Sequence, residues 1–488
     1  MSKLATALKN TSYNTPDAVT ENGAPTFSTS GAALTDFIGQ AGAAKEDRIV
    51  SLFAPLYTHD PVLAARALFW LRDIRGNGQG RRSTFRASLR WLADNNIDML
   101  QRLLPLVPEY GRWDDLLVFD AGSKAEMLAF ELIRLTLDSG SSAAALCAKW
   151  MPRKGSVAVR LTQYMGVSPR IYRKILVSLT NVVETQMCRK EFEAINFSHV
   201  PSVAMARYTK AFRKKAPVAF GQYLADLQNV EKVASGEVKI NVDTLYPHDV
   251  IRSMKGGNAL SALIDIQWNK LKEKFASFTE KKVIVMADVS GSMEIGISGS
   301  VEAIDVSTGM AIFLSELIQG PFNGSVITFT EKPRIFDLSN YSTLYDKYTA
   351  LNKDVGYNTN VQGAFDALLK HAVSIRASQA DLPEYILLIS DMEFDTACNR
   401  QTNFQVEKRK YEEQGYTLPK VIFWNVNARG AQSPVRMSEN GTALVSGFSP
   451  SMIKTVMDAD FEQFTPYAIA LDAINVKRYD PVEEALKG

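Results

Sequence analysis

The spacing of apolar residues changes once along the chain, near residue 277. From about Gly31 to Ser277, apolar residues recur three and four positions apart, which is the period of amphipathic helices. Brief polar connections separate these stretches. Many short helices joined in this way predict a HEAT-like helical repeat that forms a ring or horseshoe. The clearest helical stretches are Pro61–Ile74, Arg81–Asn95, Lys124–Ser139 and Pro201–Lys215.

After residue 277, short apolar runs alternate with amphipathic stretches. This alternation predicts a mostly parallel, Rossmann-like sheet with helices on both faces, and therefore a multidomain α and α/β fold. In such sheets, ligands bind beyond the carboxyl ends of the strands. The predicted strands are Val283–Ala287, Ser325–Thr330, Tyr385–Ser390 and Val421–Val426, and the helices between them are at about Val301–Leu317, Val361–Ser374 and Gln405–Gln414.

A chain of 488 residues is longer than one hydrophobic core usually supports. We expect an irregular arm over residues 1–30, a helical-repeat domain over 31–277, and a sheet domain with a C-terminal extension over 278–488. No apolar run reaches membrane-spanning length, and the N-terminus has no signal-peptide core. We therefore expect a cytoplasmic monomer without membrane contact, in the host cytoplasm if the protein is viral.

The net charge of +2 hides an uneven distribution. Residues 141–220 contain 14 Lys and Arg against 3 Asp and Glu, whereas residues 281–488 contain 19 against 26. Helices so poor in acids favour a polyanion partner, although a solvated helical face is the alternative. The predicted RNA-binding residues are Lys149, Arg153, Lys154, Arg160, Arg170, Arg173, Lys174, Arg189, Lys190, His199, Arg207 and Lys210.

Aromatic rings are interleaved with these cations. Cations for phosphates and rings for unstacked bases are the ingredients of single-stranded RNA binding. The aromatic and polar groups are Trp150, Tyr164, Tyr172, Phe197, His199 and Tyr208. Several apolar side chains of this region are better explained as core residues. These are Trp113, Trp150, Ile195, Phe197 and Met205.

A glycine-rich stretch, residues 76–80, joins two predicted helices. Its glycines do not match a nucleotide-binding loop and no strand precedes them, so a tight turn between helices is the better interpretation. Three flanking arginines, Arg75, Arg81 and Arg82, are candidate phosphate contacts near a helix start.

Hard oxygen ligands follow the first predicted strand. Asp288, Ser290 and Ser292 alternate along the loop, and Thr359 and Asp391 lie on two other loops that emerge at the same edge of the predicted sheet. Two carboxylates and three hydroxyls suit Mg²⁺, with Mn²⁺ or Ca²⁺ possible, and leave room for water and an acidic ligand. The alternative is that these side chains only cap helices and shape turns.

No catalytic residue emerges from the sequence. Glu294, Glu393 and Asp395 lie near the predicted metal ligands, but no histidine adjoins a candidate serine or cysteine nucleophile. We expect a protein that is not an enzyme. The cysteines and histidines show neither disulfide nor zinc spacing. They are Cys147, Cys188, Cys398, His59, His199, His248 and His371.

The sheet region resembles the von Willebrand factor A domain. DVSGSM at residue 288, the NTN element at residue 358 and ISDMEFD at residue 389 resemble that family's three metal-binding loops, and the likeness covers about Lys281–Pro466. The resemblance implies a metal-ion-dependent adhesion site. Its ligands would be Asp288, Ser290, Ser292, Thr359 and Asp391.

Helical repeats followed by such a domain resemble the TROVE architecture of Ro ribonucleoproteins, in particular a Ro-like branch from viruses, plants and fungi. The resemblance implies a ring closed by the A domain that receives structured or misfolded small RNA, or RNA with a free single-stranded end. The segments that carry it are YGRWDDLL (Tyr110–Leu117), AKWMPRKGS (Ala148–Ser156), YRKILVSL (Tyr172–Leu179) and INFSHVPSVAMARY (Ile195–Tyr208).

Two hypotheses follow from these patterns. The first is a Ro-like RNA-binding scaffold that uses its basic helices. The second is a metal-dependent interaction module, in which an acidic side chain of a protein partner completes the metal shell.

Overall fold

The computed structural model describes residues 13–487 except 77, 181, 243–244, 256–260, 276–280, 299–300, 319, 354–355, 357, 397–400, 450–451, 453–455 and 457–463. Contacts group the described residues into two compact units. The first unit draws on Met1–Ala67, Tyr246–Lys255 and Leu271–Val476, and the second on Leu68–Leu245, Gly256–Lys270 and Lys477–Gly488. Residue 277, where the sequence pattern changes, therefore does not separate the two units, because the first unit contains segments from both sides of it.

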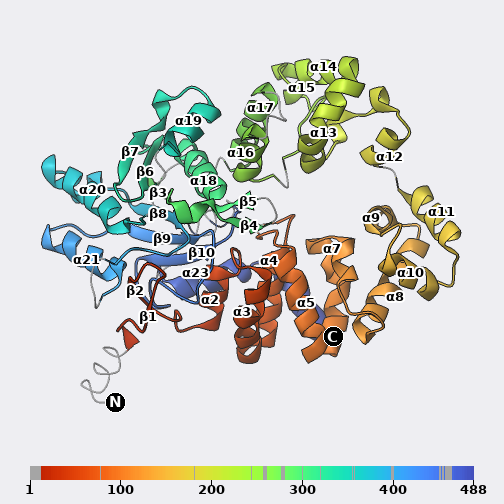
Figure 1. Cartoon of the computed structure of the whole chain (residues 1–488), viewed down its shortest axis with the longest axis horizontal. Coiled ribbons are helices and arrows are strands. Elements are labelled where there is room, and N and C mark those ends of the chain that lie inside the picture. The colour runs from red at the N-terminus through yellow and green to blue at the C-terminus, as the bar shows by residue number, and fades with distance from the viewer. Residues whose placement is uncertain are drawn as a thin grey trace. The chain divides into compact units, whose positions relative to one another are not determined.

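The first unit contains a six-stranded sheet (Figure 1). Five strands are parallel, and only the edge pair β6–β7 is antiparallel, so the predicted mostly parallel sheet is confirmed. The four predicted strands are present, but the prediction missed both edges of the sheet. In sheet order, the strands are β10 (Thr442–Ser446), β9 (Lys420–Asn425), β8 (Tyr385–Ser390), β3 (Val283–Asp288), β6 (Ser325–Phe329) and β7 (Arg334–Asp337).

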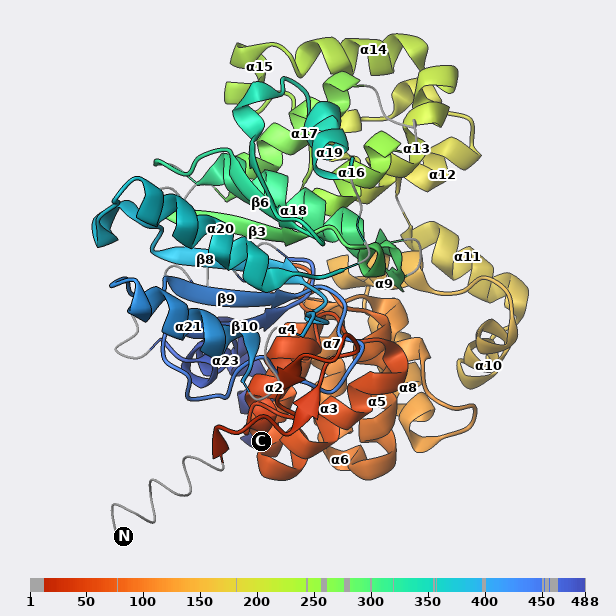
Figure 2. The same ribbon diagram turned by 60° about the vertical axis from the view of Figure 1, so that its left-hand side comes forward.

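Helices cover both faces of this sheet (Figures 1 and 2). On one face lie α20 (Val361–Ser374) and α21 (Asn403–Glu413). On the other lies α18 (Ala303–Leu317), which packs on β3. The helix α2 (Ala33–Gln40) lies on the first face, where its Gly39 approaches Leu444 of the same apolar cluster, and α23 (Pro466–Ile474) packs against α2 and β10. Further out, α3 packs on α2, and α16 and α19 pack on α18. These three helices are Glu46–His59, Pro247–Lys255 and Leu344–Leu351.

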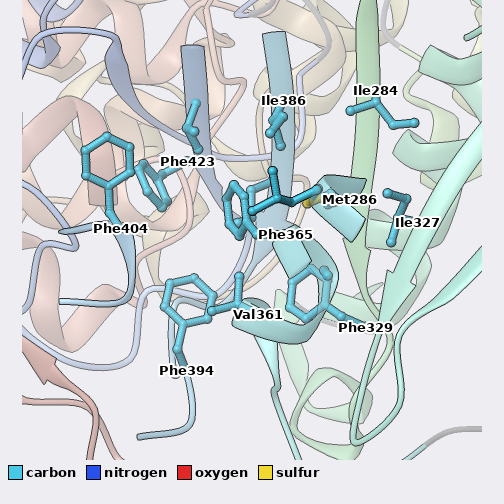
Figure 3. Close-up of a cluster of buried hydrophobic side chains, with 14 of the residues drawn as sticks. Ile284, Met286, Ile327, Phe329, Val361, Phe365, Ile386, Phe394, Phe404 and Phe423 are labelled. Carbon is cyan, nitrogen blue, oxygen red and sulfur yellow. The ribbon is translucent and has the colours of Figure 1, made fainter. Parts of the chain in front are cut away.

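Alternation along the strands supplies both faces with apolar side chains. Ile284 and Met286 of β3 point to the same side as Ile386 of β8, where they meet Phe365 of α20 (Figure 3). The intervening residues of β3 and β8 are buried as well, because the opposite face is also covered. A strand buried on both faces has no place for a charged side chain until its end.

The second unit consists of helices. Its first group packs in chain order, with α5 against α6, α6 against α8, α8 against α9, and α9 against α11. A second group is built around α13 and α14. The mostly helical region is therefore confirmed, while its closure into a ring stays a prediction. The helices of the unit are α5 (Ser83–Asn95), α6 (Ile97–Leu103), α7 (Val107–Tyr110), η2 (Trp113–Leu117), α8 (Lys124–Asp138), α9 (Ser142–Trp150), α10 (Ser156–Tyr164), α11 (Pro169–Leu179), α12 (Val183–Cys188), η3 (Phe192–Ala194), η4 (Phe197–His199), α13 (Ser202–Lys215), α14 (Pro217–Asp226) and α15 (Val230–Ala234).

Two helices, α4 (Pro61–Arg72) and α17 (Ser261–Lys274), run from one unit into the other. The end of the chain belongs to the second unit, where α24 (Asp480–Lys487) packs against α6. Arg478, just before α24, is 3.2 Å from the buried carboxylate of Asp73. None of the helices formed by the described residues is both long and apolar enough to span a membrane.

Burial of Glu407 on α21 generates a prediction about stability and pH. Its Oε1 lies 2.8 Å from Lys410 Nζ, whereas its Oε2 has no hydrogen-bond partner among the described residues. Burial raises the pKa of the Glu407 carboxyl to about 7, and Lys410 offsets only part of this effect. The folded protein therefore holds this proton where an unfolded chain, with a pKa near 4.3, releases it.

Stability from this group is present at low pH and is lost as the pH rises to 7. We expect Glu407→Gln to increase the free energy of unfolding, relative to the unaltered protein, by roughly 1–3 kcal/mol more at pH 8 than at pH 5. Urea unfolding of both proteins at the two pH values measures this difference. Glu412→Gln, on the exposed side of α21, is the matched control and should show no such difference. An identical gain at pH 5 and pH 8 would contradict the prediction.

Candidate functional site

Three loops of the first unit meet at the carboxyl edge of the sheet. Asp288 ends β3, Ser290 directly precedes the turn η6 (Gly291–Glu294), and Ser292 lies in that turn. Ser290 Oγ lies 3.0 Å from Ser292 Oγ and accepts a 3.4 Å hydrogen bond from Thr359 Oγ1, just before α20. Asp391 directly follows β8, the neighbour of β3. The five predicted ligand residues therefore lie on loops at one edge, as the parallel strands require.

Hydrogen bonds hold this edge in place around Asp288. Its Oδ1 accepts from the Ser290 amide at 2.9 Å, and its Oδ2 accepts from Ser390 Oγ at 2.7 Å. The Gly291 amide donates to the Gly356 carbonyl at 2.7 Å, which ties the turn after β3 to the loop that carries Thr359. A backbone amide and a serine hydroxyl thus fix the orientation of the Asp288 carboxylate.

The site is buried and contains two carboxyl groups. Asp288, Ser290, Thr359 and Asp391 are buried, and Ser292 is half-buried. Burial raises the pKa of Asp288, and the negative charge of Asp391 raises it further. Both effects arise because two carboxylates share a region with little water, and a positive charge between them would relieve the repulsion.

Arg429 supplies a positive charge that sequence analysis missed. Its Nη2 lies 2.7 Å from Asp391 Oδ2, and its Nη1 lies 2.9 Å from Glu21 Oε2. The sequence could have indicated Arg429 only through its position after β9, because the loops that follow the parallel neighbours β8 and β9 emerge at the same edge of the sheet. Nothing in the spacing of these residues indicates the pair, since they are 38 residues apart.

The N-terminal segment packs along the loops of this edge. Within the described part of the predicted irregular arm, residues 13–30, residues 20–27 bond to segments far along the chain. Thr20 Oγ1 donates to the Phe394 carbonyl at 2.7 Å, and the Glu21 amide donates to Glu393 Oε2 at 2.7 Å. Phe27 exchanges backbone hydrogen bonds with Ser433. The two-residue strands β1 (Ala18–Val19) and β2 (Pro25–Thr26) pair beside these contacts.

The acids near the site have different roles. Glu393 is buried and holds the N-terminal segment, and Asp395 Oδ2 accepts from the Thr359 amide at 2.9 Å. These two residues organise loops, whereas Glu294 is exposed. Among the described residues, no three His, Cys, Asp or Glu side chains gather into a metal-binding group, so any metal here would depend on hydroxyl ligands.

Of the cysteines, Cys147 is buried and Cys188 is exposed, and both are free, whereas Cys398 lies outside the described residues. Burial raises the pKa of the Cys147 thiol to about 12, which makes it a poor nucleophile. His248 is buried between Tyr246 and Phe448, whereas His59, His199 and His371 are exposed.

The predicted RNA-binding residues lie in the second unit on or beside α9 to α13. Arg160 pairs with Glu126 at 2.7 Å, so its charge is already neutralised. The other eleven have no carboxylate partner in the part of the chain that the structure describes. Lys149 is half-buried and the remaining ten are exposed. These ten are Arg153, Lys154, Arg170, Arg173, Lys174, Arg189, Lys190, His199, Arg207 and Lys210.

The structure excludes two of the six aromatic and polar groups that were predicted to contact RNA bases, because both are part of the core. Tyr172 is buried and donates its hydroxyl to the Pro152 carbonyl, and Phe197 is packed among Phe212, Phe220 and Tyr223. Their contribution is to the core. The core assignment is likewise confirmed for Trp113, Ile195 and Met205, whereas Trp150 is only half-buried.

Comparisons with known proteins show similarity along both parts of the chain. Residues 282–479 match a family model described as Domain of unknown function (DUF7788), and residues 20–107 and 134–284 match Domain of unknown function (DUF2828). An uncharacterized protein of Acanthamoeba polyphaga mimivirus is 28% identical over 513 residues, which cover 95% of this chain and 88% of that protein. The crystal structure of the Ro (RSR) protein of Deinococcus radiodurans aligns with a TM-score of 0.43 and 16% identity, over 91% of this chain and 99% of that one.

The pair of Arg429 and Asp391 generates a prediction that needs no ligand. Arg429→Met leaves the buried Asp391 carboxylate without its cation, so we expect a loss of about 2–4 kcal/mol in the free energy of unfolding. Adding Asp391→Asn should recover part of that loss, because it removes the uncompensated charge. Urea unfolding in the presence of a chelator measures both variants.

Arg409→Met is the control, because Arg409 and its partner Glu413 are both exposed. We expect that change to cost less than about 1 kcal/mol. If Arg429→Met costs the same whether residue 391 is Asp or Asn, the charge of Asp391 is not what Arg429 stabilises.

Proposed function

We propose that this chain is a Ro-like scaffold that binds structured RNA, or RNA with a free single-stranded end, through the basic helices of its second unit. The observation that carries the proposal is that eleven of the twelve predicted contacts have no carboxylate partner among the described residues. Unpaired cations gathered on neighbouring helices attract a polyanion and release its counterions on binding. The sequence resemblance to Ro-like proteins points to the same class of ligand.

The placement of cations on α11 strengthens this interpretation. Arg170, Arg173 and Lys174 lie in the first half of the helix, and the first turn contains no acid. The helix dipole disfavours positive charge at this end, so these residues cost helix stability rather than adding to it. Exposed Ile171 lies among them, which adds an apolar contact surface. A ligand with negative charge accounts for both features.

Cations on α13 have a second explanation. Arg213, Lys214 and Lys215 lie in its last turn, where the helix dipole favours positive charge. Their presence is therefore accounted for by the helix alone. For this reason α11 is the more informative place for a test.

We further propose that the carboxyl edge of the sheet holds a divalent cation, with Mg²⁺ first and Mn²⁺ or Ca²⁺ as alternatives. The residues fit such an ion, because Ser290 Oγ lies 3.0 Å from Ser292 Oγ and 3.4 Å from Thr359 Oγ1, and the buried Asp288 is bonded to the Ser290 amide. Asp391 would be the fifth metal ligand, although its carboxylate also pairs with Arg429. When bound, the ion supplies a positive centre for an acidic side chain of a protein partner.

In this proposal the protein binds and does not catalyse. Glu393 and Asp395 are engaged with backbone amides, and burial raises the pKa of the Cys147 thiol, which disfavours the nucleophilic thiolate. Purified protein incubated with RNA in Mg²⁺ or Mn²⁺ should leave the RNA intact. Turnover of RNA that is lost with Asp288→Ala would replace the scaffold with an enzyme.

The RNA proposal predicts the effect of reversing the charges of α11. We expect Arg170→Glu, Arg173→Glu and Lys174→Glu together to weaken binding of a hairpin RNA with a free end by on the order of 100-fold or more, because phosphate contacts are replaced by repulsion. Fluorescence anisotropy at several salt concentrations measures the affinity. Affinity for the unaltered protein should fall steeply as salt rises.

The control reverses three exposed cations of the first unit and so changes the net charge equally. Lys370→Glu, Arg376→Glu and Arg409→Glu lie on or after α20 and on α21, outside the basic helices. We expect these changes to leave RNA affinity within a few-fold of the original value. Equal losses in the two triple variants would mean that net charge, rather than the α11 surface, governs binding.

The metal proposal predicts that Asp288→Asn abolishes Mn²⁺ binding measured by isothermal titration calorimetry, because it removes the buried charge at the centre of the site. Ser292→Ala should weaken binding by about tenfold through loss of one neutral ligand. Glu294→Gln, on the same turn but exposed, is the control and should bind as the unaltered protein does. Undiminished Mn²⁺ binding by Asp288→Asn would rule out this site.

A further inference from the structure

An arginine cluster surrounds two aspartates in the second unit. Its guanidinium groups belong to Arg72 at the end of α4, Arg82 and Arg86 at the start of α5, and Arg112 just before η2. Asp115 accepts from Arg72 Nε at 2.8 Å and from Arg86 Nε at 2.7 Å. Asp114 accepts from Arg112 Nε at 3.2 Å and also pairs with Arg82 and Arg86.

The charges of this cluster do not cancel. Four arginines face two carboxylates, and Asp114 and Asp115 are the acids that pair with these arginines among the described residues. Burial lowers the pKa of these three side chains, the aspartates offset part of that effect, and the neighbouring guanidinium groups lower it further. A surplus of two positive charges thus remains in a partly buried place.

Part of the surplus positive charge lies at the N-terminus of α5, where the helix dipole also disfavours it. Arg82 is the residue before α5 and Arg86 is in its first turn, which contains no acid. The positive end of the helix dipole adds to the repulsion among the arginines. The packing leaves no room for relaxation, because a Cβ on Gly111 would be 2.6 Å from Asp115 Oδ2 and 2.8 Å from Arg72 Nε.

One side of the cluster is open to solvent and continues onto α9. Arg72 and Asp115 are buried at its base, whereas the side chain of Arg82 is 45% exposed. Arg112 stacks 4.0 Å from the centre of the half-buried Trp150 ring, and Lys149 Nζ lies 5.5 Å from the same ring. The half-buried Lys149 therefore adds a further cation beside the cluster, and it has no carboxylate partner among the described residues.

We infer that the open side of this arginine cluster binds a phosphate group. Arginine forks match the geometry of phosphate oxygens, and a bound dianion or phosphodiester would offset the surplus charge. The ligand class is an organic phosphate, and the phosphodiester of RNA is the member that the proposed function supplies. To that extent, the inference rests on the proposed function. The aspartates at the base hold the arginines in position.

The experiment compares the full-length protein with Arg82→Gln in inorganic phosphate and in chloride at equal ionic strength. Arg82 is the informative position because its exposed side chain can be shortened while the buried pair of Arg72 and Asp115 stays intact. Phosphate should raise the Tm of the unaltered protein in a saturable way, and this rise should be lost in Arg82→Gln. Lys149→Gln, which breaks no ion pair, should show a smaller rise than the unaltered protein.

Arg134→Gln is the matched control. Arg134 lies on α8 of the same unit and is paired with two acids, Glu131 and Asp138, so it has no surplus charge to offer. This variant should keep the full phosphate response. In parallel, the slope of log affinity against log salt for hairpin RNA should fall by about 0.7–0.9 in Arg82→Gln, the loss of one phosphate contact.

The outcomes separate this site from the proposed function. An equal phosphate response in Arg82→Gln and the unaltered protein overturns the phosphate site, even if RNA still binds through α11. The absence of any phosphate response in the unaltered protein also overturns it. If RNA does not bind but the phosphate response depends on Arg82, the RNA proposal fails and the phosphate site stands.

Discussion

Burial of a parallel sheet on both faces is the constraint on which the first unit depends. Every residue of β3 and β8 is buried, so a polar side chain on these strands is tolerated only at their ends. Because the strands are parallel and adjacent, those ends lie together. Asp288 and Asp391 are therefore near one another as a consequence of the topology, and their mutual repulsion is what a cation would relieve.

The same edge is completed by residues far apart in sequence. Arg429 binds Asp391, Glu21 binds Arg429, and the Glu21 amide binds Glu393. This chain of contacts joins the N-terminal segment to the loops after β8 and β9. A positive side chain is thus already part of the acidic edge, and Asp288 remains the carboxylate whose oxygens bind only neutral donors among the described residues.

Positive charge is handled differently in three places of the second unit. Arg160 is neutralised by Glu126, the arginine cluster is neutralised in part by two aspartates, and the cations of α11 have no carboxylate partner among the described residues. Placement relative to helix ends sharpens the contrast, because α5 and α11 both carry cations where the dipole disfavours them. Such placements reduce the stability of the helices, and the anionic ligand that we propose would offset this cost.

The amino-acid sequence by itself determined most of the elements and the order of the loops that carry the predicted metal ligands. The helix α20 and the strand β8 agree with prediction at every residue, because long apolar periods and buried runs are local signals. The edge strands β7 and β10 escaped prediction, since β7 is mostly exposed and both are short. Only the tertiary structure decided which polar groups meet. The pairing of Arg429 with Asp391, the burial of Tyr172 and the four arginines around Asp114 and Asp115 all depend on contacts between segments distant in sequence, and no local pattern encodes those contacts.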